Sequence, residues 1–298
     1  LAGPIAGYLA GVPVRIQTMA GLVSPMKKGL KGWLIRQAEI LSFQFCTDVW
    51  PNSHTSMDYM VRTKMIKAAK AKVIGRGSTN GIDLERFNPA AIKPERLDEI
   101  KKTVDFQPGD QVLLFAGRMV KDKGVEELVA VFERLQPEFP HLKLVLLGPL
   151  EADLDPLNSR TLQSISSNKR IVHINWTDEV EYYLSFAKLF VFPSYREGFP
   201  NVIMQAGAMK CPVVCSEIVG NIDIITHKVN GILHKVQDED SLYEAVLFAL
   251  HNNDQMHQLA LKLFSDMVTY YDRYALYELY IKEYKELYAK RAKHPVDS

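Results

Sequence analysis

A strand–helix–strand pattern occupies residues 111–148, which read QVLLFAGRMVKDKGVEELVAVFERLQPEFPHLKLVLLG. The apolar runs 111–117 and 143–148 are long enough for strands, and residues 125–138 between them have helical spacing. Continuous apolar strands joined by a helix are typical of a parallel sheet that is covered on both faces. The segment therefore predicts a doubly wound α/β domain.

The same alternation extends over most of the chain in both directions. Residues 75–89 (GRGSTNGIDLERFNP) are rich in Gly, Asn and Pro and predict a connector between two domains. Further strands are expected at 12–19, 47–51, 72–74, 171–175, 189–194, 212–216 and 231–235. In the last helix, a repeat of apolar and aromatic residues predicts a core-facing stripe formed by Tyr277, Tyr280, Ile281, Tyr284 and Tyr288.

Composition and charge narrow the class of protein. The 298 residues suffice for two domains, and 47% hydrophobic with 24% charged residues is typical of a globular protein. A net charge of +1 argues against nucleic-acid binding. No segment has the pattern of a signal peptide or a membrane span. Cys46, Cys211 and Cys215 are interpreted as reduced core thiols, so we expect a cytoplasmic protein.

Two loops that follow strands have side chains suited to a phosphorylated ligand, which doubly wound domains bind at the carboxyl ends of their strands. In the first loop, residues 117–124, Arg118 offers a planar fork for phosphate oxygens and Lys123 a compact charge. A solvated basic turn is the alternative interpretation. The histidines have no metal-ligand spacing, so no metal site is predicted.

The second loop, residues 195–201, combines a carboxylate with the start of a helix. Gly198 lets the backbone approach a ligand, and Pro200 and Asn201 occupy the expected first turn, whose free N–H groups can hold an anion. Glu197 is better suited to sugar hydroxyls than to phosphate, and Gln205 could border the same crevice. The alternative for Glu197 is an acidic residue that the helix dipole favours.

Four segments in order resemble the retaining GT-B glycosyltransferases of family four, the group 1 type found in bacterial polysaccharide biosynthesis. They are NGIDLERF (80–87), LLFAGRMVKDKGVEELV (113–129), FVFPSYREGFPNVIMQAGAMKCPVV (190–214) and NGILHKVQDEDSL (230–242). The resemblance implies two Rossmann-like doubly wound domains that face a cleft. The implied parts are an acceptor-binding domain over 1–85, a donor-binding domain over 86–271 and a C-terminal helix over 272–298 that packs back toward the first domain.

A Rossmann-like domain has on the order of 150 residues, so the acceptor domain is expected to be incomplete at its start. The uncapped residues 1–10 likewise look like the middle of a helix. We therefore expect further residues upstream of this chain.

The resemblance also implies residue roles. Arg118 and Lys123 match the pair that neutralises the donor diphosphate, and Glu197 matches the acid that holds hydroxyls of the transferred sugar. The remaining donor contacts that it implies are Gly198, Phe199, Pro200, Asn201, Val202, Gln205, Asn175 and Trp176. The sequence departs from the family in two places. Gln205 replaces an acid that usually grips the ribose, and Ala20 stands where many relatives have a histidine.

The implied activity is that of a hexosyltransferase that retains anomeric configuration and needs no metal or other cofactor. A nucleotide diphosphate sugar would donate to a hydroxyl of a saccharide or a lipid-linked saccharide. Two alternatives stay open: a GT-B nucleotide-sugar epimerase or hydrolase, and a sugar-nucleotide-binding protein with weakened catalysis.

Two further segments invite functional interpretations. Residues 26–45 place lysines beside apolar side chains, which fits either contact with the inner membrane face near a lipid-linked acceptor or an ordinary surface helix. Asp153-Leu154-Asp155 looks like a metal-binding Asp-x-Asp motif, but Asp residues before a helix are usually found in turns and caps. We therefore interpret Asp153-Leu154-Asp155 as a turn.

Overall fold

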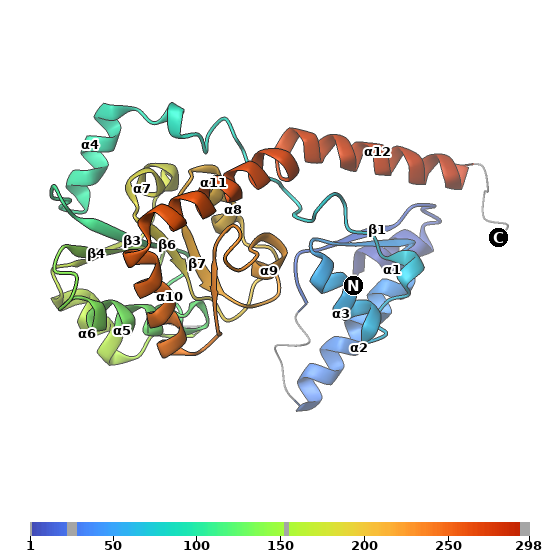
Figure 1. Ribbon diagram of the computed structural model, residues 1–298. Coiled ribbons are helices and arrows are strands. Elements are labelled where there is room, and N and C mark those ends of the chain that lie inside the picture. The colour runs from blue at the N-terminus through green and yellow to red at the C-terminus, as the bar shows by residue number, and fades with distance from the viewer. Residues whose placement is uncertain (1, 23–28, 152–154, 293–298) are drawn as a thin grey trace. The chain divides into compact units, whose positions relative to one another are not determined.

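The computed structural model describes residues 2–22, 29–151 and 155–292, and it divides the chain into two compact units (Figure 1). Unit 1 combines Leu1–Gly81 with Tyr270–Ser298, and unit 2 is Ile82–Thr269. The chain therefore leaves unit 1 once and returns to it at its end.

Unit 2 is built on a six-stranded sheet in which all paired strands are parallel. The order of its strands is β5-β4-β3-β6-β7-β8. This order, 3-2-1-4-5-6 in chain sequence, is that of a dinucleotide-binding fold, and it confirms the doubly wound prediction. The strands are β3 (Gln111–Ala116), β4 (Leu142–Leu147), β5 (Ile171–Ile174), β6 (Leu189–Phe192), β7 (Val213–Ser216) and β8 (Ile232–His234).

Two groups of helices cover this sheet (Figure 1). In one group, α6 and α10 pack against α5. In the other group, α4 and α8 pack against α7. The helices of the unit are α4 (Pro94–Thr103), α5 (Val125–Leu135), α6 (Ser159–Ser167), α7 (Val180–Phe186), α8 (Asn201–Ala208), α9 (Asn221–Ile224), α10 (Glu239–His251) and α11 (Asn253–Tyr270), with short 3-10 turns at Pro89–Ala91 (η3) and Lys121–Lys123 (η4).

The apolar spacing in the sequence explains how α5 packs. Val125, Leu128, Val129, Phe132 and Leu135 repeat at helical spacing and are all buried. Burial of each such side chain contributes roughly 1.5–3 kcal/mol. The opposite positions carry charged residues, so one face alone can reach the core.

Gly124 joins the loop after β3 to α5 at a close approach between two backbone segments. Its φ is +69°, and an added Cβ would lie 2.2 Å from the carbonyl oxygen of Pro193, just after β6. No side chain fits here without moving one of the two loops. Gly124 thus fixes how closely the loops after β3 and β6 pack.

We expect Gly124→Ala to lower the free energy of unfolding by about 3 kcal/mol, because backbone strain and overpacking add. Gly109→Ala is the matched control, because Gly109 also has a positive φ (+95°) but no heavy atom lies within 4 Å of its added Cβ. That variant should lose only about 1 kcal/mol. Urea unfolding of both variants measures the difference, and equal losses would show that the contact with Pro193 is unimportant.

Unit 1 contains a parallel pair of strands, β1 (Ile16–Met19) and β2 (Asp48–Pro51). Val49 of β2 forms a core with Phe43, Met60 and Met65. The expected strand at 72–74 is absent, since the chain makes only an isolated bridge between Val49 and Ala71 there. The helices are α1 (Ala2–Leu9), α2 (Gly29–Phe45), α3 (His54–Arg62) and α12 (Arg273–Ala292), with a 3-10 turn η2 at Ala68–Lys70.

The prediction of a core-facing stripe on α12 is wrong for most of its members. Tyr277, Ile281, Tyr284 and Tyr288 are all exposed in unit 1. Leu276 and Tyr280 instead pack against the buried Trp50. The ring of Tyr284, although 48% exposed, also contacts Trp50, with the two ring centroids 4.9 Å apart. Helical spacing identified an apolar side of the helix but could not show how much of it the unit covers.

Candidate functional site

The site lies where the direction of strand addition reverses in the sheet of unit 2. From β3 the chain adds β4 and β5 on one side, and it then returns to add β6, β7 and β8 on the other. β3 and β6 are neighbours, with Leu113 paired to Leu189. Ligands of doubly wound domains bind at this reversal, outside the carboxyl ends of the strands. The two predicted loops, 117–124 and 195–201, follow these two strands.

The structure brings Lys123 and Glu197 together. Nζ of Lys123 lies 2.5 Å from Oε1 of Glu197, and each side chain is 15% exposed. A charge-assisted pair with so little exposure is screened less by water than a surface pair. A cation and a carboxylate therefore meet between the loops after β3 and β6.

Arg118 lies at the same edge of the sheet but has a different partner. Its guanidinium Nη1 is 2.9 Å from Oε2 of Glu151, in the loop after β4. The Arg118 side chain is 44% exposed. It therefore remains accessible to a ligand, although the structure does not pair it with Lys123 or Glu197.

The remaining predicted donor residues occupy three places. Gly198 lies close to Gly220. A Cβ added to Gly220 would be 2.7 Å from the carbonyl oxygen of Gly198. Pro200 is the N-cap of α8, which Asn201 begins as predicted. Asn175 and Trp176 follow β5, and Trp176 is 70% exposed. Phe199, before α8, and Val202 and Gln205, on it, are partly buried.

A family model described as "Glycosyl transferases group 1" matches residues 97–262, more than half of the chain. The chain belongs to the group 1 glycosyl transferases. The matched span contains both loops of the site, from Arg118 to Gln205.

Two of the named relatives are bacterial glycosyltransferases. The chain is 28% identical over 246 residues to the capsular polysaccharide biosynthesis glycosyltransferase CapM of Staphylococcus aureus, covering 83% of this chain and 63% of that protein. It is 26% identical over 292 residues to the N,N'-diacetylbacillosaminyl-diphospho-undecaprenol alpha-1,3-N-acetylgalactosaminyltransferase of Campylobacter jejuni, covering 95% of this chain and 73% of the relative. The chain thus spans less than two thirds of the length of CapM.

A solved structure supports the fold assignment. Anabaena Alr3699/HepE, crystallised in complex with UDP, matches 95% of this chain and 75% of its own with a TM-score of 0.80 and 18% sequence identity. At this identity the match concerns the fold alone. It confirms the GT-B architecture expected for this group 1 transferase.

Sequence reasoning missed a network that ties the two loops of the transferase together. The carboxylate of Asp122 accepts a 2.8 Å hydrogen bond from Nε of Arg196, and the backbone carbonyl of Asp122 accepts one of 2.8 Å from the Tyr195 N–H. The Tyr195 hydroxyl donates to Glu127 at the start of α5. Burial, and after it this hydrogen bond, raises the pKa of Tyr195. The only sign of this network in the sequence was the opposite charge of Asp122 in one loop and Arg196 in the other.

The predicted turn at the Asp-x-Asp segment is described only at Asp155, because Asp153 and Leu154 lie outside the described residues. The carboxylate of Asp155 accepts a 2.9 Å hydrogen bond from the Asp122 N–H. Within the described parts of the chain, no group of three or more His, Cys, Asp or Glu side chains could hold a metal ion.

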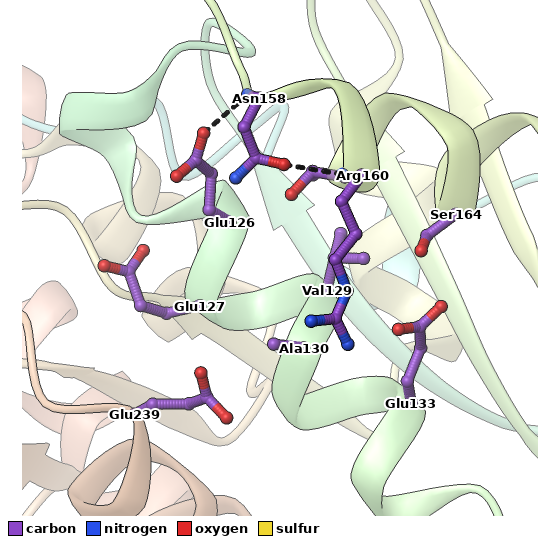
Figure 2. A pocket seen from close by; sticks show the side chains of 10 residues that line it. Glu126, Glu127, Val129, Ala130, Glu133, Asn158, Arg160, Ser164 and Glu239 are labelled. Atoms are coloured by element: carbon purple, nitrogen blue, oxygen red, sulfur yellow. Dashed lines mark hydrogen bonds between the residues drawn. The ribbon is translucent and has the colours of Figure 1, made fainter.

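A hollow of about 240 Å³ lies beside the loops, between α5 and α6. Figure 2 shows Arg160 surrounded by carboxylates, with the Asn158 N–H donating a 2.6 Å hydrogen bond to Glu126. The other acidic residues that line it are Glu127, Glu133 and Glu239. Four carboxylates against one guanidinium repel a diphosphate. Neither Arg118 nor Lys123 lines this hollow, so we do not place a nucleotide there.

Proposed function

We propose that this protein is a retaining glycosyltransferase of polysaccharide biosynthesis. It moves a hexose from a nucleotide diphosphate sugar to a hydroxyl of a saccharide or a lipid-linked saccharide. The observation that carries the proposal is the contact between Lys123 and Glu197 at the reversal point of the sheet. A diphosphate needs a cation and a sugar needs a hydrogen-bond acceptor, and the donor presents both groups side by side.

The proposed chemistry uses electrostatic stabilisation by groups that the fold holds in place. The bond between the anomeric carbon and the diphosphate oxygen breaks while the acceptor oxygen bonds to the same carbon from the same face. The acceptor proton passes to the departing diphosphate. Lys123, Arg118 and the first-turn N–H groups of α8 stabilise the charge that grows on the leaving group, so no metal is required.

The names of relatives support the choice of donor and acceptor class. The HepE structure holds UDP, and the C. jejuni relative is named for an acceptor linked to diphospho-undecaprenol. An E. coli relative, 26% identical over 251 residues, is named for UDP-Gal and a diphosphoundecaprenol-linked acceptor. We therefore propose a UDP-sugar as donor and a lipid-linked saccharide as acceptor. The exposed indole of Trp176 offers a surface against which a nucleobase can stack.

A thermal-shift panel of nucleoside diphosphates and nucleotide sugars tests the donor site. A ligand at a hundredfold excess over its Kd stabilises the folded state by about 2.7 kcal/mol. UDP and a UDP-sugar should therefore raise Tm by several degrees. Incubation of the UDP-sugar without acceptor separates a transferase from an epimerase or hydrolase, which would convert the sugar rapidly. If no nucleotide raises Tm, the proposed donor site is wrong.

The amide at Gln205 gives a separate prediction. A carboxylate accepts stronger hydrogen bonds from the two ribose hydroxyls than a neutral amide does, by about 1 kcal/mol. Gln205→Glu should therefore lower the Kd for UDP about fivefold, whereas Gln205→Met should raise it. Isothermal titration with UDP measures both. An unchanged Kd in both variants would place the ribose away from this side chain.

We also propose that α2 contacts the membrane face on which a lipid-linked acceptor lies. Leu30 (72% exposed), Trp33 (56%) and Leu34 (54%) form an exposed apolar strip next to Lys31. The first residues of the predicted segment, Met26, Lys27 and Lys28, lie outside the described part. None of the helices that the structure describes is both long and apolar enough to cross a bilayer.

Replacement of Trp33 and Leu34 by Glu should reduce co-sedimentation with phosphatidylglycerol vesicles at least about tenfold, because apolar burial is lost. The control is the double variant Leu162→Glu/Val268→Glu, because Leu162 and Val268 are exposed apolar side chains of unit 2. Equal losses in the two double variants would argue against a specific contact through α2.

A further inference from the structure

Unit 1 contains an apolar groove whose rim is basic. The groove has a volume of about 790 Å³ and lies between α2 and the segment that runs from the end of α3 through η2. Phe43, Met65 and Ile66 contribute to its floor, and Lys64, Lys67 and Lys70 contribute its charges. The groove lies wholly within unit 1 and shares no residue with the donor site.

The apolar lining of the groove rests on a packed core. Phe43 is 2% exposed and Met65 is 3% exposed, and both belong to the core that also holds Val49 and Met60. Ile40 and Val61, which are partly buried and pack on that core, supply accessible apolar surface in the groove. A hydrocarbon chain could cover this surface with little reorganisation of the protein.

The three lysines face no negative charge in the groove. None of the residues that line it is acidic, and no ion pair among the described residues includes Lys64, Lys67 or Lys70. The Lys70 ammonium donates to the carbonyl oxygens of Gln44 (3.1 Å) and Cys46 (2.8 Å). Since an ammonium has three donors, these bonds orient Lys70 and leave one N–H for a ligand.

We propose that this groove binds the lipid diphosphate of the acceptor, with hydrocarbon on the apolar floor and the diphosphate on the lysines. This inference rests on the proposed function, whose acceptor class it narrows. A diphosphate carries more negative charge than the single phosphodiester of a membrane phospholipid, and three ammonium groups match it better. The acidic hollow between α5 and α6 shows the opposite character and cannot serve this purpose.

The test is direct binding to the 298-residue chain, with no donor present. Farnesyl diphosphate is the probe, and farnesol, inorganic pyrophosphate and a short-chain phosphatidylglycerol are the comparisons. Farnesyl diphosphate should bind more tightly than each of them, because it alone offers both hydrocarbon and diphosphate. The double variant Lys64→Glu/Lys67→Glu should raise its Kd at least about tenfold, since two charge-assisted contacts become repulsive.

Lys282→Glu/Lys285→Glu is the matched control, because both lysines are exposed on α12 of unit 1 and the net charge changes equally. This control should keep the Kd for farnesyl diphosphate within about twofold, since exposed charges interact weakly with a ligand elsewhere. Melting of each variant checks that it is folded. Equal weakening in both double variants overturns the proposal, and so does binding of pyrophosphate or phosphatidylglycerol as tight as that of farnesyl diphosphate.

Failure of this inference and failure of the proposed function give different results. UDP stabilisation is measured in the same samples and depends on unit 2. If UDP raises Tm but farnesyl diphosphate does not bind, the groove assignment alone is wrong. If farnesyl diphosphate binds as expected while no nucleotide raises Tm, the donor assignment alone is wrong.

Discussion

Replacement of Lys123 by Ala is expected to lower kcat at least about 100-fold, because the departing diphosphate loses a preorganised cation. Removal of one such group typically costs on the order of 3 kcal/mol in the activation barrier. We expect the same lower bound for Arg118→Ala, whose guanidinium is accessible next to Glu151. Steady-state transfer from a UDP-sugar to the acceptor measures both.

Lys121 provides the control for this prediction. It is an exposed lysine in the same turn, η4, and its side chain has no assigned role in the site. Lys121→Ala should keep kcat within about threefold, because an exposed charge outside the site contributes little. Near-normal turnover for both Lys123→Ala and Arg118→Ala would refute the assignment of the diphosphate site.

Glu197→Gln is expected to lower kcat/KM for the UDP-sugar at least about 100-fold. The carboxylate is proposed to accept hydrogen bonds from sugar hydroxyls, and each hydrogen bond to a charged group contributes roughly 1.5–3 kcal/mol. The same change frees Lys123 from its ion pair, so the affinity for UDP without sugar should be unchanged or higher. Kinetics with the UDP-sugar and titration with UDP separate these two effects.

Glu151→Gln is the companion variant, because it removes the ion-pair partner of Arg118 instead. It should preserve kcat/KM within about threefold, since that pair is largely solvated. A loss of UDP affinity in Glu197→Gln that equals the loss of kcat/KM would show that Glu197 supports the loop and does not contact the sugar.

The arrangement of unit 2 could be predicted because its strands are continuous apolar runs with helices between them. Such patterns fix the parallel sheet, and the connection rules leave few possible orders. The start of α8 at Asn201 followed from Pro200, which directly precedes the first helical residue. The loops of the site could be located for the same reason, since they occupy the ends of strands.

The contact between Lys123 and Glu197 could not be predicted, although both residues were singled out. The two residues are 74 positions apart, and their approach depends on the pairing of β3 with β6 and on Gly124. The pairing of Arg118 with Glu151 was missed for a similar reason, because β4 lies next to β3 on the other side. Charges in separate loops become partners through sheet order, which local patterns do not encode.

Unit 1 was harder to predict because its strands are short. β1 has only the second half of the apolar run 12–19, and 72–74 forms no strand. The exposed tyrosines of α12 have the same helical spacing as buried ones would. Spacing reports which side of a helix is apolar, whereas its burial depends on neighbours distant in the sequence.

The ion pair between Glu197 and Lys123 has a consequence for competition by small anions. Inorganic phosphate, which is abundant in cells, would have to displace Glu197 and would leave that carboxylate without a partner. A nucleotide sugar gives both Lys123 and Glu197 a new partner. Its phosphate binds the ammonium of Lys123, and its sugar hydroxyls donate to the carboxylate of Glu197. The proposed donor site should therefore reject orthophosphate while it admits the complete donor.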